Sequence, residues 1–193
     1  ISIEALLRRV MATKVLQDHA ELIMEGEECD LSALQSSLIS MGYEAVSLVK
    51  SYGDFSVRGG VVDIYPPPFY LADGTLLDSP IRLDFFGDFI ESIKPFDPLS
   101  QRSQSRCAEA VILPVSDIVL PDDDAAARHK LGSHWLELAE ALNWSSDKAH
   151  ELGERIKNGR RFAGIEFFLP FFHGRQHTAT ILDYLPDTCG LLL

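Results

Sequence analysis

The 193-residue sequence has little of what covalent frameworks or membrane spans require. Its three cysteines, Cys29, Cys107 and Cys189, are odd in number, far apart and without CxxC spacing, which argues against a disulfide framework or a structural zinc site. We expect them to be small, buried hydrophobic side chains in a reducing cytoplasm. No apolar run is long enough to cross a bilayer, and the first 30 residues lack a basic start before an apolar stretch, so we expect no membrane contact.

Basic residues are also scarce. The sequence has 17 Lys and Arg against 29 Asp and Glu, which gives a formal net charge of −12 at pH 7. Phosphate would meet net repulsion on such a surface, so we expect no unaided binding of duplex DNA. Apolar residues make up 46% of the chain, enough to fill the core of one large domain or two small ones.

Sequence motifs for catalysis are missing. There is no GxxxxGK[ST], no GxGxxG after a strand, no HExxH and no GxSxG, and the six histidines do not have metal-ligand spacing. The sequence therefore predicts no catalytic residue, no metal site, no bound cofactor and no ATP hydrolysis by this chain. A small hydrolase that uses Asp63, His173 or Asp183 is the alternative from another functional class.

Helical periodicity is found on both sides of a central region. Residues 3–10 have helical spacing after Ser2, a suitable N-cap. A second helix is predicted over residues 31–41, from Asp30 as N-cap to Gly42 as a left-handed stop. Its predicted inward stripe is Leu31, Leu34, Leu38 and Ile39.

Helices are predicted again after Pro114. One follows Pro121 and the acidic run Asp122–Asp124, and another runs from Ser145 or Ser146 to Asn158-Gly159. The expected core aromatics after it are Phe167, Phe168, Phe171 and Phe172. The segments Ile181–Tyr184 and Gly190–Leu193 are predicted to be buried strands.

Short β-type runs fill the region from Tyr43 to Leu113. They are Val46–Lys50, Asp54–Tyr65, Ile81–Phe86, Phe89–Phe96 and Ala108–Leu113. Gly87-Asp88 predicts a tight hairpin turn, and Gly59-Gly60 predicts a bulge or a close backbone approach. Phe69–Ser79 is predicted to be a surface loop with Asp73-Gly74 at its tip.

These elements predict an α+β fold, in which the helix over residues 31–41 packs against a mainly antiparallel sheet and a partial α/β portion follows. We place one domain at residues 21–113, with its boundary near Leu113. Residues 1–20 are then the end of a preceding α/β domain, and residues 114–193 are a helical and α/β segment that completes it.

Strand alternation gathers two arginines and one large aromatic residue on one face of this sheet. The predicted inward set is Phe55, Val57, Ile81, Leu83 and Phe85. The predicted outward set is Asp54, Ser56, Arg58, Arg82, Asp84 and Phe86. Arginine and aromatic side chains are enriched at binding hot spots, so this face is a candidate partner surface. The alternative is a solvated face in which Arg58 and Arg82 pair with Asp54 and Asp84, each pair contributing under about 1 kcal/mol.

Several ordered strings carry a family resemblance. They are GDFSVRGGVVDIYP over residues 53–66, IRLDFFGD over 81–88, FDP at 96–98 with QRS at 101–103, GIEFFLP over 164–170 and LDYLP over 182–186. From about Ile3 to Leu193 the chain resembles the N-terminal UvrB-homology region of bacterial transcription-repair coupling factors. The excision-repair protein UvrB shares much of this pattern. QRS after FDP, and LPFF after GIE, favour the coupling factors, and a piece of UvrB is the alternative.

The resemblance implies a recruiting function. Coupling factors are ATP-driven translocases on double-stranded DNA that remove stalled RNA polymerase and recruit UvrA. The resemblance implies that ATP, Mg²⁺, DNA and RNA polymerase are bound by parts of the longer protein that are absent from this sequence. It also implies that residues 21–113 are the UvrA-binding module, with Arg58, Arg82 and Phe86 as the contacts. Strand alternation selects the same face.

Overall fold

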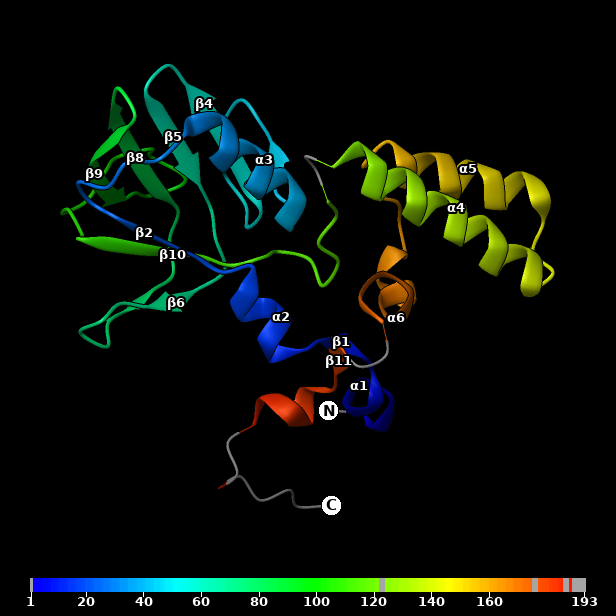
Figure 1. Cartoon of the computed structure of the whole chain (residues 1–193). Helices are drawn as coiled ribbons and strands as arrows, with labels where there is room; N and C mark the ends of the chain where they lie inside the picture. The colour runs from blue at the N-terminus through cyan, green and yellow to red at the C-terminus, as the bar shows by residue number, and fades with distance from the viewer. Residues whose placement is uncertain (1, 122–123, 175–176, 186–187, 189–193) are drawn as a thin grey trace. The chain divides into compact units, whose positions relative to one another are not determined.

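The computed structural model describes residues 2–121, 124–174, 177–185 and 188, which belong to two compact units (Figure 1). One unit is residues 19–119, and the other combines residues 1–18 with residues 120–193. Helices and mainly antiparallel strands together give the α+β fold that the sequence predicted. Among the described helices, none is both long and apolar enough to cross a membrane.

The unit of residues 19–119 is built on a five-stranded sheet with the order β3-β4-β5-β8-β9. Its strands are β3 (Glu44–Ala45), β4 (Asp54–Arg58), β5 (Val61–Ile64), β8 (Ile81–Phe86) and β9 (Phe89–Pro95). All neighbours are antiparallel except β3 and β4. Two smaller antiparallel pairs join β2 (Glu21–Met24) to β10 (Glu109–Ile112), and β6 (Phe69–Tyr70) to β7 (Leu76–Leu77).

Helix α3 (Leu31–Met41) covers one face of the five-stranded sheet (Figure 1). Asp30 caps it as predicted, since its Oδ1 accepts hydrogen bonds from the backbone N–H groups of residues 32 and 33 at 2.7 and 3.0 Å. Gly42, with φ +101°, ends it as predicted. Ile39 is exposed, contrary to the predicted stripe, because the buried side follows positions 34, 38 and 41 and Met41 fills the third position.

The predicted run Asp54–Tyr65 is two strands rather than one, because Gly59-Gly60 forms the turn of a β4–β5 hairpin. The predicted close approach is present at Gly60. The Gly60 carbonyl accepts a hydrogen bond from Phe85 N at 2.7 Å. A Cβ atom on Gly60 would lie 3.0 Å from Phe85 O. Gly87-Asp88 forms the predicted turn between β8 and β9, with φ +62° at Gly87.

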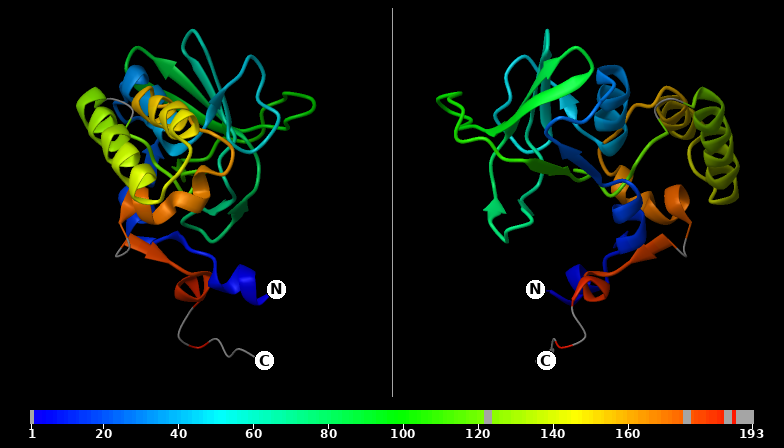
Figure 2. Two further views of the ribbon diagram at one scale, coloured as in Figure 1. Left: turned by 90° about the vertical axis from the view of Figure 1, so that its right-hand side faces the viewer. Right: turned by 60° about the vertical axis from the view of Figure 1, so that its left-hand side comes forward.

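Two other β-region predictions are wrong. Val46–Lys50 is not a strand, because the Asp54 carboxylate accepts hydrogen bonds from the N–H groups of Lys50 and Ser51 and shapes a turn there. Phe69–Ser79 contains the β6–β7 hairpin, which projects from the sheet as an arm (Figure 2). The buried Phe69 ring joins this arm to the core, so it is more than a loop.

The second unit is mainly helical. Its elements are α1 (Ile3–Leu7), β1 (Val10–Met11), α2 (Thr13–Asp18), α4 (Ala125–Ala141), α5 (Ser146–Lys157), the 3₁₀ helix η1 (Ile165–Phe168), α6 (Leu169–His173), β11 (Thr178–Ala179) and the 3₁₀ helix η3 (Ile181–Tyr184). Helices α4 and α5 form a hairpin around Trp135, whose Nε1 donates to Ala149 O at 3.1 Å.

Two of the predicted core aromatics, Phe168 and Phe171, pack edge-on against the Trp135 ring. Phe167 was predicted to join them, but it is exposed because the 3₁₀ turn directs it away.

The ends of this unit differ from the prediction in two places, whereas the predicted helix start at the acidic run is confirmed at Asp124. Ser2 caps α1 as expected, but the helix stops at Leu7 because Val10 pairs with Ala179 as a strand. Ile181–Tyr184 is a 3₁₀ helix rather than a strand, held by Asp183 and Thr180 in a capping box. Asp124 is the N-cap of α4, whereas Asp122, Asp123, Cys189 and Gly190–Leu193 lie outside the described residues.

Leu83 provides a test of the sheet core. Its side chain is fully buried among α3 and the central strands, so Leu83→Ala should open a cavity and lower the free energy of unfolding by about 2–5 kcal/mol. Leu99→Ala is the matched control, because Leu99 is 92% exposed and should change stability by no more than about 0.5 kcal/mol. Urea unfolding measures both variants. Equal stability of the two would contradict this core.

Candidate functional site

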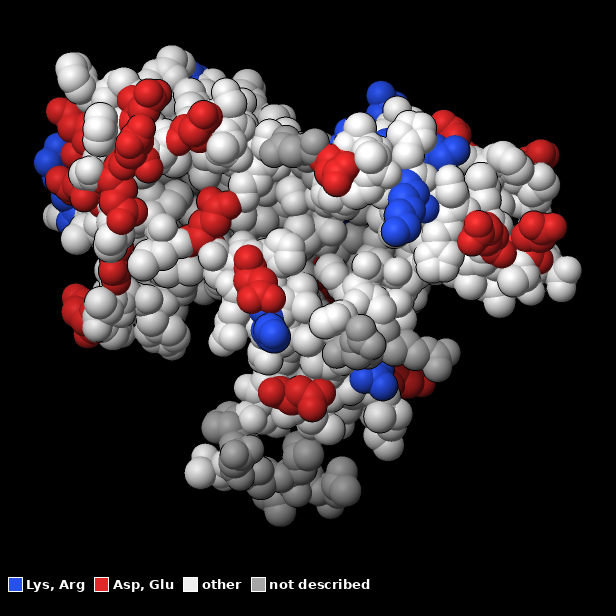
Figure 3. Space-filling model, in the orientation of Figure 1, with Lys and Arg blue, Asp and Glu red and all other residues white. Residues whose placement is uncertain are grey.

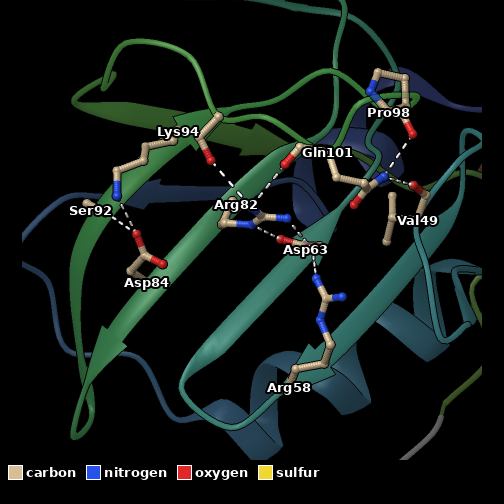
Figure 4. A network of polar contacts seen from close by, with 10 residues as sticks. Val49, Arg58, Asp63, Arg82, Asp84, Ser92, Lys94, Pro98 and Gln101 are labelled. Atoms are coloured by element: carbon tan, nitrogen blue, oxygen red, sulfur yellow. Dashed lines mark hydrogen bonds and ion pairs between the residues drawn. The ribbon is translucent and has the colours of Figure 1, made fainter.

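The sheet face opposite α3 carries the residues that alternation selected. We call it the polar face, and its charged and hydroxyl side chains are Ser56, Arg58, Asp63, Arg82, Asp84, Ser92 and Lys94. The register places Arg58 beside Val61 and Asp84 on successive strands, and Asp63 beside Arg82 and Lys94. Figure 4 shows Arg58 and Arg82 reaching the Asp63 carboxylate from the strands on either side of it.

Asp63 is the centre of the polar face. Its side chain is 1% exposed, and both carboxylate oxygens accept from Arg82, with Nε 2.7 Å from Oδ1 and Nη2 2.9 Å from Oδ2. Arg58 Nη2 donates a further hydrogen bond to Oδ2. A buried carboxylate needs such partners, because an unpaired buried charge is strongly unfavourable. The predicted pairing of these arginines with Asp54 and Asp84 is therefore wrong: the two share Asp63.

Most of the Arg82 guanidinium is engaged by partners within its own domain. Besides Asp63, its guanidinium lies 4.8 Å from the centroid of the Phe96 ring, and Nη1 is 3.4 Å from Ser103 Oγ and 3.5 Å from Gln101 O. Only 19% of its side chain is exposed, so it is far less open than alternation predicted. Hydrogen bonding to Asp63 raises the pKa of Arg82 above its usual value, although burial opposes this.

The loop after β9 builds one wall of this arginine site. Gln101 has φ +60°, and its Nε2 donates to Val49 O at 3.1 Å and to Pro98 O at 2.8 Å, which fixes the loop over the sheet. Ser100 N donates to Asp97 Oδ1 at 2.6 Å inside the same loop. The strings FDP and QRS were used only as signs of resemblance. The structure shows that they hold Arg82, a role that single-strand reasoning missed.

A second ion pair lies beside the first. Lys94 Nζ and Ser92 Oγ both donate to Asp84 Oδ2 at 2.6 Å (Figure 4). Burial raises the pKa of Asp84, but these hydrogen bonds lower it by more, so the pKa lies below its usual value. Asp84 is therefore ionised at neutral pH and satisfied within the sheet.

Arg58 and Phe86 are the predicted site residues that solvent reaches best. The Arg58 side chain is 48% exposed, and within the described residues only its Nη2 makes a recorded hydrogen bond. Phe86 is 79% exposed. Leu48, Val61 and Gln101 join Arg58, Arg82 and Asp84 in lining a shallow depression on this face. Among the predicted site residues, the half-exposed Arg58 guanidinium and the exposed Phe86 ring are therefore the groups that a partner could contact.

Charge is unevenly distributed over the unit of residues 19–119. It holds 16 of the 29 acidic residues but only six of the 17 basic ones. Figure 3 shows acidic side chains over the side of this unit that faces the viewer. Three of the six cations, Arg58, Arg82 and Lys94, project from the polar face. Half of the cations of an acidic unit thus lie on the face where the sequence predicted binding, together with the acids Asp63 and Asp84.

Two of the three residues named for a hydrolase, Asp63 and Asp183, have other roles in the structure. Asp63 is buried between two arginines, and Asp183 caps the 3₁₀ helix with Thr180. Cys29 and Cys107 are partly buried, and burial raises the pKa of both thiols, as expected of unreactive side chains. Within the described ranges, no group of three His, Cys, Asp or Glu side chains is placed to hold a metal ion.

Comparison with known proteins agrees with this geometry. Residues 22–117 match the family described as the UvrB interaction domain, so the sheet unit with its polar face is a domain of that class. The chain as a whole belongs to the transcription-repair-coupling factor family, which settles the choice against a piece of UvrB.

Three relatives support this assignment. The factor of Myxococcus xanthus is 34% identical over 97% of the chain, that of Bacillus subtilis 28% identical over 99%, and that of Escherichia coli 30% identical over 96%. The chain spans only 15–16% of the length of these relatives. The part of the chain that the family model matches, residues 22–117, is the UvrB interaction region.

The two arginines should differ in their effect on stability. Arg82→Ala leaves Asp63 buried with a single cation and should cost about 3–5 kcal/mol of unfolding free energy. Arg58→Ala should cost less, because the bidentate Arg82 pair remains. In a double-mutant cycle measured by urea unfolding, Asp63→Ala with Arg82→Ala should cost clearly less than the sum of the single changes. Strict additivity would contradict the buried pair.

The Asp84–Lys94 pair predicts a pH dependence. Because the pKa of Asp84 lies below 3.8 in the folded chain, its stabilising effect is present above that pH and is lost as pH falls through the lowered value. Lys94→Met should therefore reduce stability at pH 7 by up to about 1 kcal/mol, with the difference from the parent fading as the pH falls through the lowered pKa of Asp84. Unfolding titrations across this range measure it, with Lys50→Met as the control. A difference that is constant with pH would contradict the pair.

Proposed function

We propose that this chain recruits UvrA to stalled RNA polymerase in transcription-coupled nucleotide excision repair, as the UvrA-binding part of a coupling factor. The observation that carries the proposal is the polar face. It brings an exposed aromatic ring and a half-exposed guanidinium to one side of a domain of the UvrB interaction family. Binding of RNA polymerase, ATP with Mg²⁺, and double-stranded DNA belongs in this proposal to the rest of the longer protein.

The proposal assigns different roles to the three residues. Phe86 supplies an apolar anchor that enters a pocket on UvrA, because a ring this exposed contributes little to the core of its own domain. Arg58 supplies the planar fork for a carboxylate or carbonyl of UvrA, through the donors that Asp63 leaves free. Arg82 contributes a smaller contact area to the interface, since most of its guanidinium is already hydrogen-bonded to Asp63.

Electrostatics supports a protein partner for this face. The unit is acidic overall, so nucleic acid would meet net repulsion from most of its surface. Across strands β4, β5, β8 and β9 the polar face has the cations Arg58, Arg82 and Lys94 and the acids Asp63 and Asp84. It therefore has one net positive charge, which suits a local acidic group on a protein. A contact of this kind buries roughly 1,200–2,000 Å² in total.

A binding titration of this chain against purified UvrA tests the proposal. Phe86→Ala and Arg58→Ala should each weaken binding about thirty-fold, because truncating a central anchor costs about 2 kcal/mol. Phe86→Ala should leave the melting temperature nearly unchanged, since the ring is exposed. Ile39→Ala is the exposed control and should bind like the parent, because Ile39 lies on α3, which covers the opposite face of the sheet. Failure of the parent chain to bind UvrA would overturn the proposal.

A further inference from the structure

We propose that Phe89 is a second aromatic anchor, which acts with Phe86 as one two-ring surface for UvrA. We call these two residues the aromatic pair. The inference rests on the proposed function and adds to it a residue that strand alternation did not select. Phe86 and Phe89 are directly opposite each other in the β8–β9 ladder, with only Gly87-Asp88 between them. Their side chains therefore leave the sheet on the same face as neighbours.

A bulge in β9 puts Phe89 on the polar face. Ser92 pairs with Asp84, but Ile90 pairs with Phe85, so Glu91 has no partner in the ladder. If residues 89–92 alternated regularly, with Glu91 counted in the ladder, Phe89 would turn toward the core and Ile90 toward solvent. The structure has the reverse, with Ile90 1% exposed and Phe89 53% exposed. The bulge thus presents a large ring to solvent where regular pairing would bury it.

The aromatic pair is held in place before any partner arrives. The chain segment of residues 26–29 runs along the hairpin tip and forms three backbone hydrogen bonds with it. Cys29 N donates to Asp88 O at 2.7 Å, Gly26 N donates to Ile90 O at 2.8 Å, and Ile90 N donates to Glu27 O at 3.0 Å. A rigid tip loses little conformational freedom on binding, so exposed rings there are well suited to serve as anchors.

The aromatic pair continues the site already described. The β4–β5 and β8–β9 turns lie at the same end of the sheet, and the hydrogen bond from Phe85 N to Gly60 O joins their strands there. Arg58 ends β4 at this side, and Val61 and Asp84 lie between it and Phe86. A partner that accepts both rings while bonding Arg58 needs an apolar socket with an oxygen acceptor at its edge. We assign this chemistry to UvrA.

Two other exposed rings, Phe167 and Tyr70, do not share this arrangement. Phe167 lies under the Arg8 guanidinium, with 5.9 Å from Cζ to the ring centroid. Tyr70 lies on the β6–β7 arm and pairs with an aliphatic residue, Leu76. Tyr70 is 69% exposed in the same unit as the aromatic pair, and it therefore offers a matched aromatic control away from the polar face.

The test compares single and paired truncations in the UvrA titration. Phe89→Ala should weaken binding about ten-fold and leave the melting temperature nearly unchanged, whereas Tyr70→Ala should bind like the parent. The double change of Phe86 and Phe89 to Ala should weaken binding by less than the product of the single effects, because the two rings fill one socket.

Each outcome has a distinct meaning. If the parent binds UvrA, Phe86→Ala weakens binding and Phe89→Ala does not, the second anchor is overturned while the proposed function stands. If Tyr70→Ala weakens binding as much as Phe89→Ala, the effect is not specific to the aromatic pair and the inference fails. If the parent does not bind, both the proposed function and the inference fail.

Discussion

The buried carboxylate of Asp63 is the constraint around which the sheet domain is organised. A charge with 1% of its side chain exposed is tolerated only with close cationic partners, and here these come from the strands on both sides of β5. A shift of one residue in the register of either neighbouring strand would turn an arginine to the core side and leave the carboxylate short of donors. The ion pairs therefore specify the register of β4, β5 and β8.

This constraint also shapes the surface that a partner meets. Asp63 and the loop after β9 occupy most of Arg82, so that residue contributes mainly to the framework. Arg58 makes one contact with the same carboxylate, which orients its guanidinium and leaves other donors for a partner. Ordering a long side chain in advance reduces the entropy lost on binding. The buried Asp63 carboxylate thus stabilises the fold and also orients the Arg58 guanidinium before a partner binds.

The sequence predicted the elements whose signals are local. Asp30 and Gly42 delimit α3 because capping depends on a few adjacent residues, and the glycine turn after Phe86 is equally local. The face carrying Arg58 and Arg82 was also predicted, since alternation within one strand fixes it. The partner of these arginines was not, because Asp63 lies on a strand hidden inside the run Asp54–Tyr65, and cross-strand register cannot be read from one strand.

Phe89 shows most clearly what alternation alone omits. Its direction depends on Glu91 being unpaired, and a bulge is a property of two strands together. The segment of residues 26–29 bonds to the tip of the hairpin from a distant part of the chain, so neither the bulge nor its support has a local signature. Gly60 allows the turn between β4 and β5, next to Arg58, to lie close to strand β8. A residue with a side chain at position 60 would place its Cβ against the Phe85 carbonyl. These backbone features place Arg58, Phe86 and Phe89 at the same end of the sheet. The residue types alone would not bring these three side chains together.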